Sequence, residues 1–183
     1  MIKIIGYLKI PLIKYMKIIQ IFFDFIDSVS KYLGNFASTF YIFIVFFTSY
    51  EVLMRYVFNN PTDWVFETCI YLSGAAICMA GPFVTQQQAH ISITTILDQL
   101  PKKLRNAIQI FNITFACIVC FILCYACLPW GWAALLNWET SGTGLDSPGP
   151  GIVKPMIGAA AFLMGMQFIV NLYKHITKIK SQS

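Results

Sequence analysis

Hydrophobic residues fill four long stretches of the chain that contain no Asp, Glu, Lys, Arg or His. These stretches cover residues 32–50, 68–89, 106–138 and 155–173. Each is long enough for one crossing, because a transmembrane helix needs about 20 apolar residues. Their hydrophobicity does not alternate with a period of two, and an unclosed sheet cannot satisfy its backbone in hydrocarbon. The pattern therefore predicts an all-α membrane protein with four transmembrane helices, at about residues 33–57, 64–88, 106–130 and 153–174.

The first 31 residues follow a different pattern, in which lysines are spread among apolar residues. On a helical wheel one face carries Leu12, Tyr15, Ile19, Phe22, Phe23, Ile26 and Val29, and the other carries Lys14, Lys17, Gln20, Asp24, Asp27, Ser28 and Lys31. Such faces are typical of helices that lie in the membrane surface. We predict that residues 1–31 form an amphipathic interfacial helix, with Lys14 and Lys17 toward anionic headgroups, and that residues 32–183 form the transmembrane domain. The alternative is a helix that packs on a partner protein.

The few charged residues predict the orientation. Only 11% of the residues are charged, against about 25% in soluble domains. Eleven of the 13 Lys and Arg residues lie in the N-terminal segment, the second connection or the C-terminal tail, and only Arg55 and Lys154 lie by the first and third connections. The positive-inside rule then places both termini in the cytoplasm. Trp64, Trp130, Trp132 and Trp138 fall by the two outer connections, and we expect the last three to anchor the outer membrane interface.

Cysteine and histidine do not support a metal or haem site. Cys117, Cys120, Cys124 and Cys127 share one helix face over ten residues, or about 15 Å. Four thiolates spread over that length cannot meet at one zinc ion, so we expect packing residues on a seam between helices. His90 and His175 lie at the predicted cytoplasmic edges, outside the spans. The sequence predicts no catalytic residue, metal, cofactor, enzyme activity or nucleic-acid partner.

The stretch YEVLMRYVFNNPTDWVFE, residues 50–67, places charges beside hydrophobic runs. Glu51 and Arg55 are four residues apart and share a helix face. Pro61 ends the helix before it, and Glu67 falls on the early turns of the next span. One interpretation is a helical hairpin with an interfacial ion pair. The other is a buried polar contact, within the bundle or with another subunit, because a carboxylate at depth is costly without a partner.

The same residues carry a family resemblance. The pattern E-V-x-x-R-Y-V-F-N-N-P-x-x-W-x-x-E at residues 51–67 resembles the signature of the small membrane subunit of TRAP transporters, the tripartite ATP-independent periplasmic systems (DctQ type). AHISITTILDQLPKKLR at residues 89–105 is similar to the cytoplasmic connection of that family, although Ser92 and Thr94 stand where family members often carry a basic and an acidic residue. Pro155 and Gly158 also fit, and the resemblance covers about residues 35–175.

This resemblance implies a role in sodium-coupled uptake (symport) of an organic acid across the bacterial inner membrane. In that family a periplasmic binding protein captures a carboxylate-containing solute, such as sialic acid or a C4-dicarboxylate. A large membrane subunit carries the substrate and sodium sites, and the small subunit is its non-catalytic scaffold. We therefore expect Glu51, Arg55, Trp64 and Glu67 to stabilise the hairpin or its contact with the large subunit.

Two alternatives remain open at the level of sequence. The acidic, Gly- and Pro-rich connection at residues 139–151, with Glu139 and Asp146, either docks the binding protein or is an ordinary flexible loop. The alternative function for the whole chain is a self-contained homodimeric antiporter of the small multidrug type, with Glu51 as its proton site. An exporter works alone as a dimer, whereas a TRAP small subunit depends on its partner.

Overall fold

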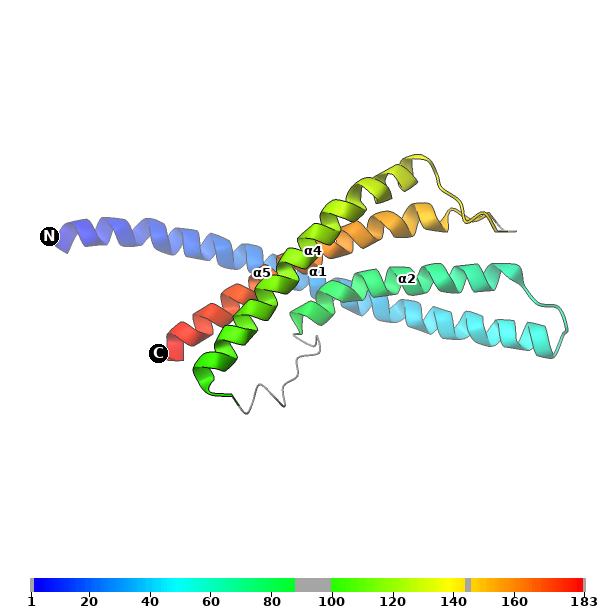
Figure 1. Ribbon diagram of the computed structural model, residues 1–183, viewed down its shortest axis with the longest axis horizontal. Coiled ribbons are helices and arrows are strands. Elements are labelled where there is room, and N and C mark those ends of the chain that lie inside the picture. The colour runs from blue at the N-terminus through cyan, green and yellow to red at the C-terminus, as the bar shows by residue number, and fades with distance from the viewer. Residues whose placement is uncertain (1, 88–99, 144–145, 183) are drawn as a thin grey trace.

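The computed structural model describes residues 2–87, 100–143 and 146–182, with side chains described from residue 17 to residue 180 within these ranges. The described residues form four helices and no strand (Figure 1). They are α1 (Ile2–Tyr56), α2 (Asp63–Gln86), α4 (Lys102–Leu136) and α5 (Gly149–Gln182). Each contains a stretch long and apolar enough to cross a membrane, which confirms the predicted all-α protein with four membrane-length helices.

The helices form two hairpins. α1 packs along α2, and α4 packs along α5. The hairpins meet mainly through α2 and α5, with a smaller contact between α1 and α5. In Figure 1 residues 57–62 and the described residues of the loop after α4 (137–143 and 146–148) lie at one end of the molecule, and both termini lie toward the other end. This is the arrangement that four sequential crossings require.

Small residues bring α4 and α5 together. A Cβ added at Gly131 would lie 2.7 Å from the Cα of Pro155, so the two backbones touch there. Farther along, the thiol of Cys117 donates to the carbonyl of Gly165 at 3.6 Å. Cys120 and Cys124 are buried. The cysteine row therefore packs on a helix–helix seam, as its spacing predicts.

α1 is one unbroken helix of 55 residues, about 80 Å long. It runs through the predicted boundary between an interfacial segment and a span at residue 31. Its packing face includes Ile26, Ser30 and Ala37, all buried. Asp27, which the wheel places on the polar face with the lysines, contacts Gln167 and Lys174 of α5. The surface location of residues 1–31 stays a prediction, and the side chain of Lys14 lies outside the described residues.

The other helices run past most of their predicted limits. α4 continues through Pro129 to Leu136, past the predicted limit of its span at about residue 130. α5 begins at Gly149 and continues through its lysine-rich tail to Gln182. Lysine ends the run of apolar residues but does not end a helix, because its helix propensity is high. Only α2, which begins and ends within two residues of the predicted limits, follows the hydrophobic pattern closely.

Candidate functional site: two polar layers

Polar contacts gather at the two ends of the helix bundle, and we name the two groups by position. The outer layer, at the loop end, contains Glu51, Arg55, Thr62, Glu67, Glu139, Ser141, Ser147 and Lys154. The inner layer, toward the termini, contains Asp27, Ser30, Thr85, Gln86, Gln167, Asn171 and Lys174. Each layer joins helices that lie far apart in the sequence.

Glu51 fastens the turn of the first hairpin. One carboxylate oxygen accepts a hydrogen bond from Arg55 at 2.9 Å. The other accepts from the backbone N–H of Thr62 at 3.1 Å and from its hydroxyl. Thr62 is the residue that precedes α2. Its hydroxyl donates a hydrogen bond to Glu51 and does not cap the N-terminus of α2. A carboxylate with three donors is well satisfied, and it connects the end of α1 to the start of α2.

Trp64 closes the same hairpin with aromatic contacts. Its ring centroid lies 5.8 Å from that of Phe47 in an edge-on arrangement and 6.1 Å from that of Tyr50. Both partners are on α1. The tryptophan therefore packs against the neighbouring helix, while 39% of it stays exposed. Edge-to-face pairs contribute beyond their buried area. Glu51, Arg55 and Trp64 thus lie together, as the hairpin interpretation expects.

Glu67 lies on α2 and is only 7% exposed. Its two carboxylate oxygens accept hydrogen bonds from Ser141 at 3.2 Å and Ser147 at 2.6 Å. Both serines belong to the loop between α4 and α5, which closes on itself through a bond from the N–H of Ser141 to the carbonyl of Ser147 at 2.9 Å. The buried polar contact that the sequence suggested lies within the chain. Glu67 holds the second hairpin's loop against the first hairpin.

The start of α5 carries a second charged contact. Lys154 forms an ion pair with Glu139, and its ammonium lies 4.5 Å from the centre of the Trp130 ring. The N–H of Gly151 also donates to the carbonyl of Glu139 at 3.2 Å. Trp130 therefore has a partner inside the chain in addition to its predicted place at the membrane interface. Lys154 and Trp130 fix the end of α4 against the start of α5.

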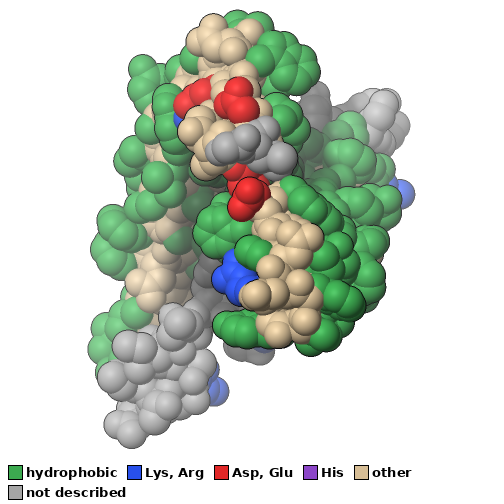
Figure 2. Space-filling view, turned by 90° about the vertical axis from the view of Figure 1, so that its right-hand side faces the viewer, with side chains coloured by type: hydrophobic (Ala, Val, Ile, Leu, Met, Phe, Trp, Pro, Cys, Tyr) green, Lys and Arg blue, Asp and Glu red, His purple; other side chains and the backbone are tan. Residues whose placement is uncertain are grey.

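The remaining predicted outer residues are exposed. Trp132 and Trp138 are 61% and 70% exposed, which leaves their rings open to the surroundings. Asp146 is exposed and has a left-handed backbone, with φ of 47°. Figure 2 looks onto the loop end of the molecule and shows acidic side chains gathered there. Glu139 is paired, whereas Asp146 has no ion-pair partner among the described residues.

A cavity of about 460 Å³ opens beside Glu67. Its lining residues are Asp63, Phe66, Glu67, Ile70, Tyr71, Ser141, Thr143 and Pro150. Among these described residues, Asp63 and Glu67 are the ones that carry a charged group. The start of α2 and the loop after α4 thus form a hollow of negative charge at the outer end.

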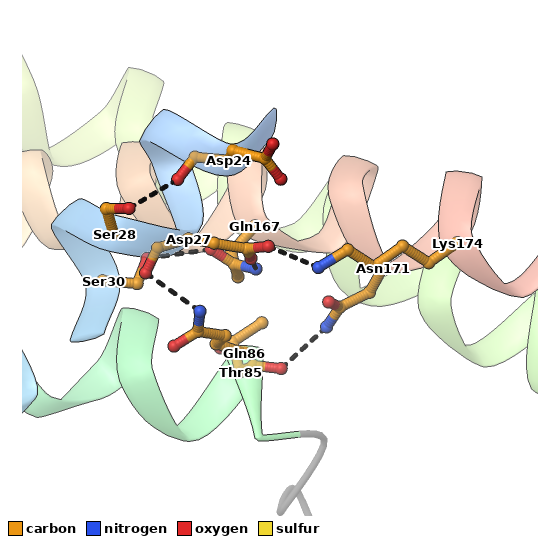
Figure 3. A network of polar contacts seen from close by, with 9 residues as sticks. All are labelled: Asp24, Asp27, Ser28, Ser30, Thr85, Gln86, Gln167, Asn171 and Lys174. Carbon is orange, nitrogen blue, oxygen red and sulfur yellow. Dashed lines mark hydrogen bonds and ion pairs between the residues drawn. The ribbon is translucent and has the colours of Figure 1, made fainter. Parts of the chain in front are cut away.

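The inner layer centres on Asp27 of α1 and Gln167 of α5 (Figure 3). One Asp27 oxygen accepts from the Gln167 amide at 2.7 Å, and the other oxygen accepts from Lys174. The Gln167 side-chain oxygen accepts from the hydroxyl of Ser30 at 2.8 Å. Gln167 is fully buried and Ser30 almost so. This chain of contacts joins α1 to α5 where the helices cross.

The end of α2 joins the same layer. The Gln86 amide donates to the backbone carbonyl of Asp27 at 2.9 Å. The Asn171 amide donates to the carbonyl of Thr85 at 2.7 Å, which is one of the carbonyls near the end of α2. Sequence reasoning missed this layer. The sequence does contain one signal for this layer, which is the pair of amides Gln167 and Asn171 within the apolar stretch 155–173. In membrane proteins such amides form hydrogen bonds between helices.

The two layers bracket a thickness that matches a bilayer. Asp27 and Glu51 are 24 residues apart on α1, which corresponds to about 36 Å along the helix. Lys154 and Lys174 are 20 residues apart on α5, or about 30 Å. A hydrocarbon core is about 30 Å thick. The spacing between the two layers is therefore close to the thickness of a hydrocarbon core. The described residues contain no group of three or more His, Cys, Asp or Glu side chains that could hold a metal ion.

Comparison with known families fits this arrangement. Residues 44–178 match the family described as "Tripartite ATP-independent periplasmic transporters, DctQ component". The chain belongs to the DctQ family. It is similar to the C4-dicarboxylate TRAP transporter small permease protein DctQ of Vibrio cholerae serotype O1, with 23% identity over 109 residues, or 60% of this chain. The matched part is 45% of the length of that relative.

The family assignment confirms the resemblance carried by residues 51–67 and makes this chain a component of a transporter rather than an enzyme. The matched range contains the whole outer layer and the α2 and α5 parts of the inner layer, but it begins after Asp27 and Ser30 of α1. Most of the connection at residues 89–105, including His90, Ser92 and Thr94, lies outside the described residues. The outer layer is therefore the candidate site that family membership and geometry share.

Proposed function

We propose that this DctQ chain is the non-catalytic small subunit of a sodium-coupled TRAP uptake system, and that it holds the large membrane subunit in place. One observation carries this proposal: Glu51 and Glu67, the two carboxylates of the motif, both bind loops of their own chain. A site for substrate or ion would leave such oxygens directed at a ligand. Here they fasten the two hairpins, which is what a static scaffold needs.

A scaffold suits transport in which one domain moves. The moving part requires a wall that keeps its shape, and a wall is stiff when its helices are joined at both ends. The outer layer joins α1, α2 and the α4–α5 loop, and the inner layer joins α1, α2 and α5. The many exposed apolar side chains between the layers would face lipid or the large subunit.

The proposed location is the bacterial inner membrane, with both termini in the cytoplasm and the two short loops in the periplasm. Its support is the distribution of lysine and arginine, since eleven of 13 lie away from the loop end. The solute is a carboxylate-containing molecule. A C4-dicarboxylate is the first candidate to test, because it appears in the name of the Vibrio cholerae relative, and sialic acid is the second.

Purification of the tagged chain from its native membrane in mild detergent tests the proposal. A much larger polytopic protein should accompany it in a stoichiometric amount. Glu51→Gln and Arg55→Leu should lower the yield of that complex or the uptake, because they weaken the hairpin, and should leave the solute affinity of the isolated binding protein unchanged. Normal assembly and uptake in both variants would contradict a structural role for this pair.

Docking of the periplasmic binding protein is a second part of the proposal. The loop end presents the acidic cavity and the exposed Asp146, whereas Glu139 is paired with Lys154. We expect a basic patch of the binding protein to meet this end. Replacement of Glu139 and Asp146 by serine should weaken docking and make it less sensitive to salt. An unchanged docking affinity would mean that residues 139–151 are an ordinary loop.

The homodimeric antiporter is less consistent with this geometry. A proton site needs a carboxylate that alternates between two sides of the membrane. Glu51 is held by Arg55 and Thr62 at the loop end of α1, where α1 ends after one further turn and a half. Purification distinguishes the two functions, since an exporter would come out as a homodimer with no larger chain.

A further inference from the structure

The inner half of α1 carries a second polar face, which none of the other described helices covers. Its members recur every three or four residues and are Asp24, Ser28, Lys31, Asn35 and Ser38. All five are exposed. Ser30 and Ala37, on the opposite side of the same turns, are 1% exposed and pack inside the bundle. We call these five residues the outward stripe, because the spacing places them on one face that points away from the chain.

The outward stripe extends from the membrane edge into the hydrocarbon. Asn35 lies eight residues beyond Asp27 of the inner layer, or about 12 Å along the helix. It lies 16 residues before Glu51 of the outer layer, or about 24 Å. Asn35 and Ser38 are therefore at a depth where lipid chains would surround them if nothing else did.

Asn35 has unmet hydrogen-bonding capacity at that depth. Ser28 and Ser38 satisfy their hydroxyls within the helix, by donating to the carbonyls of Asp24 at 2.8 Å and Asn35 at 2.6 Å. The side-chain amide of Asn35 has no hydrogen bond to any residue that the structure describes. An exposed amide offers two donors and an acceptor that lipid chains cannot match. In membrane helices such groups bond across to another helix.

A second copy of this chain fits the outward stripe poorly. Two parallel copies related by a twofold axis along the membrane normal would bring Lys31 against Lys31 and Asp24 against Asp24. Like charges at close range oppose such a pair. A different chain can instead present a carboxylate opposite Lys31 and an amide or hydroxyl opposite Asn35. The charge order along the stripe therefore favours a heterologous partner.

We propose that the outward stripe is the surface on which a transmembrane helix of the large TRAP subunit packs, with a hydrogen-bonding side chain of that helix against Asn35. This inference rests on the proposed function, and it selects the face of α1, rather than that of α4, for the contact. Small residues on the partner would allow the close approach that a short amide requires.

Photo-crosslinking in the complete complex tests the position. The crosslinking residue p-benzoylphenylalanine replaces Ser38 in the outward stripe and, as a matched control, Ile122, which is 61% exposed on α4. After illumination of membranes, position 38 should give an adduct with the large subunit and position 122 should give none. An adduct between two copies of this chain, or no adduct from position 38 while the large subunit copurifies, would overturn the inference. Absence of the large subunit from the purification would instead contradict the proposed function.

Substitution of the amide gives an independent measure. Asn35→Leu should weaken association with the large subunit by roughly threefold, as is typical of one hydrogen bond between membrane helices. Asn35→Gln should restore most of it, since it keeps the amide. If both variants associated with the large subunit as strongly as the unchanged chain, at equal amounts of chain in the membrane, Asn35 would face lipid.

Discussion

Asp27 provides the sharpest test of the inner layer, because its two oxygens have partners of very different burial. Gln167 is fully buried, whereas the Lys174 side chain is 51% exposed. Asp27→Ala removes the acceptor of the Gln167 amide, and a buried donor left without a partner costs about 1–3 kcal/mol. Loss of the exposed ion pair adds about 0–1 kcal/mol. The expected loss for Asp27→Ala is therefore about 1–4 kcal/mol, most of it from the unpaired Gln167 amide.

Lys174→Met removes the ion pair alone and should cost less than about 1 kcal/mol. Asp24→Ala is the matched control: Asp24 is an exposed carboxylate one turn earlier on α1, and only its backbone carbonyl has a described hydrogen bond. It should leave the stability of the isolated chain unchanged. Unfolding of the full chain in detergent, followed by circular dichroism, measures all three. If Lys174→Met destabilised the chain as much as Asp27→Ala, the ion pair rather than Gln167 would hold the layer together.

Three further substitutions test other contacts. Gly131→Val should lower the folding yield sharply, because a Cβ at this position would lie 2.7 Å from the Cα of Pro155, and a backbone atom cannot move aside as a side chain can. The amount of monodisperse protein recovered measures the folding yield. Glu67→Gln keeps the shape but loses the charge, so residues 139–148 should be cleaved faster by added protease, while an unchanged rate would exclude Glu67 as the loop's anchor. Lys154→Met removes the cation over Trp130, worth about 0.5–1 kcal/mol, and should lower the melting temperature by about 1–4 °C.

The hydrophobic pattern predicted the four membrane-length helices that the described residues form. It reports where the chain is apolar, and a span must be apolar over a fixed length. The hydrophobic pattern does not show where a helix ends. Lysine or proline at the edge of a span interrupts the run of apolar residues, but the helix can continue past it. α5 accordingly extends eight residues past the predicted residue 174, and α4 extends six past residue 130.

Local sequence also predicted contacts between near neighbours. Glu51 and Arg55 form the pair that a spacing of four residues allows. The partners of Glu67 and Asp27 could not be predicted in this way, because they lie 74 and 140 residues away. Those contacts depend on how the two hairpins cross. On the wheel, Asp27 joined the polar face because it is charged, yet a charge next to a buried amide is equally compatible with the inside of a bundle.

The unbroken course of α1 bears on its first 25 residues. Our proposed placement of the bilayer, between Asp27 and Glu51, leaves residues 2–26 to continue for about 37 Å beyond the inner layer. A helix that crosses the membrane can lie in its surface only after a break, and α1 contains none. Ile18, Ile21 and Phe22 are nonetheless exposed and apolar, so something must cover them. Packing on a partner protein requires no break, and the outward stripe, which begins at Asp24, would continue directly into such a contact.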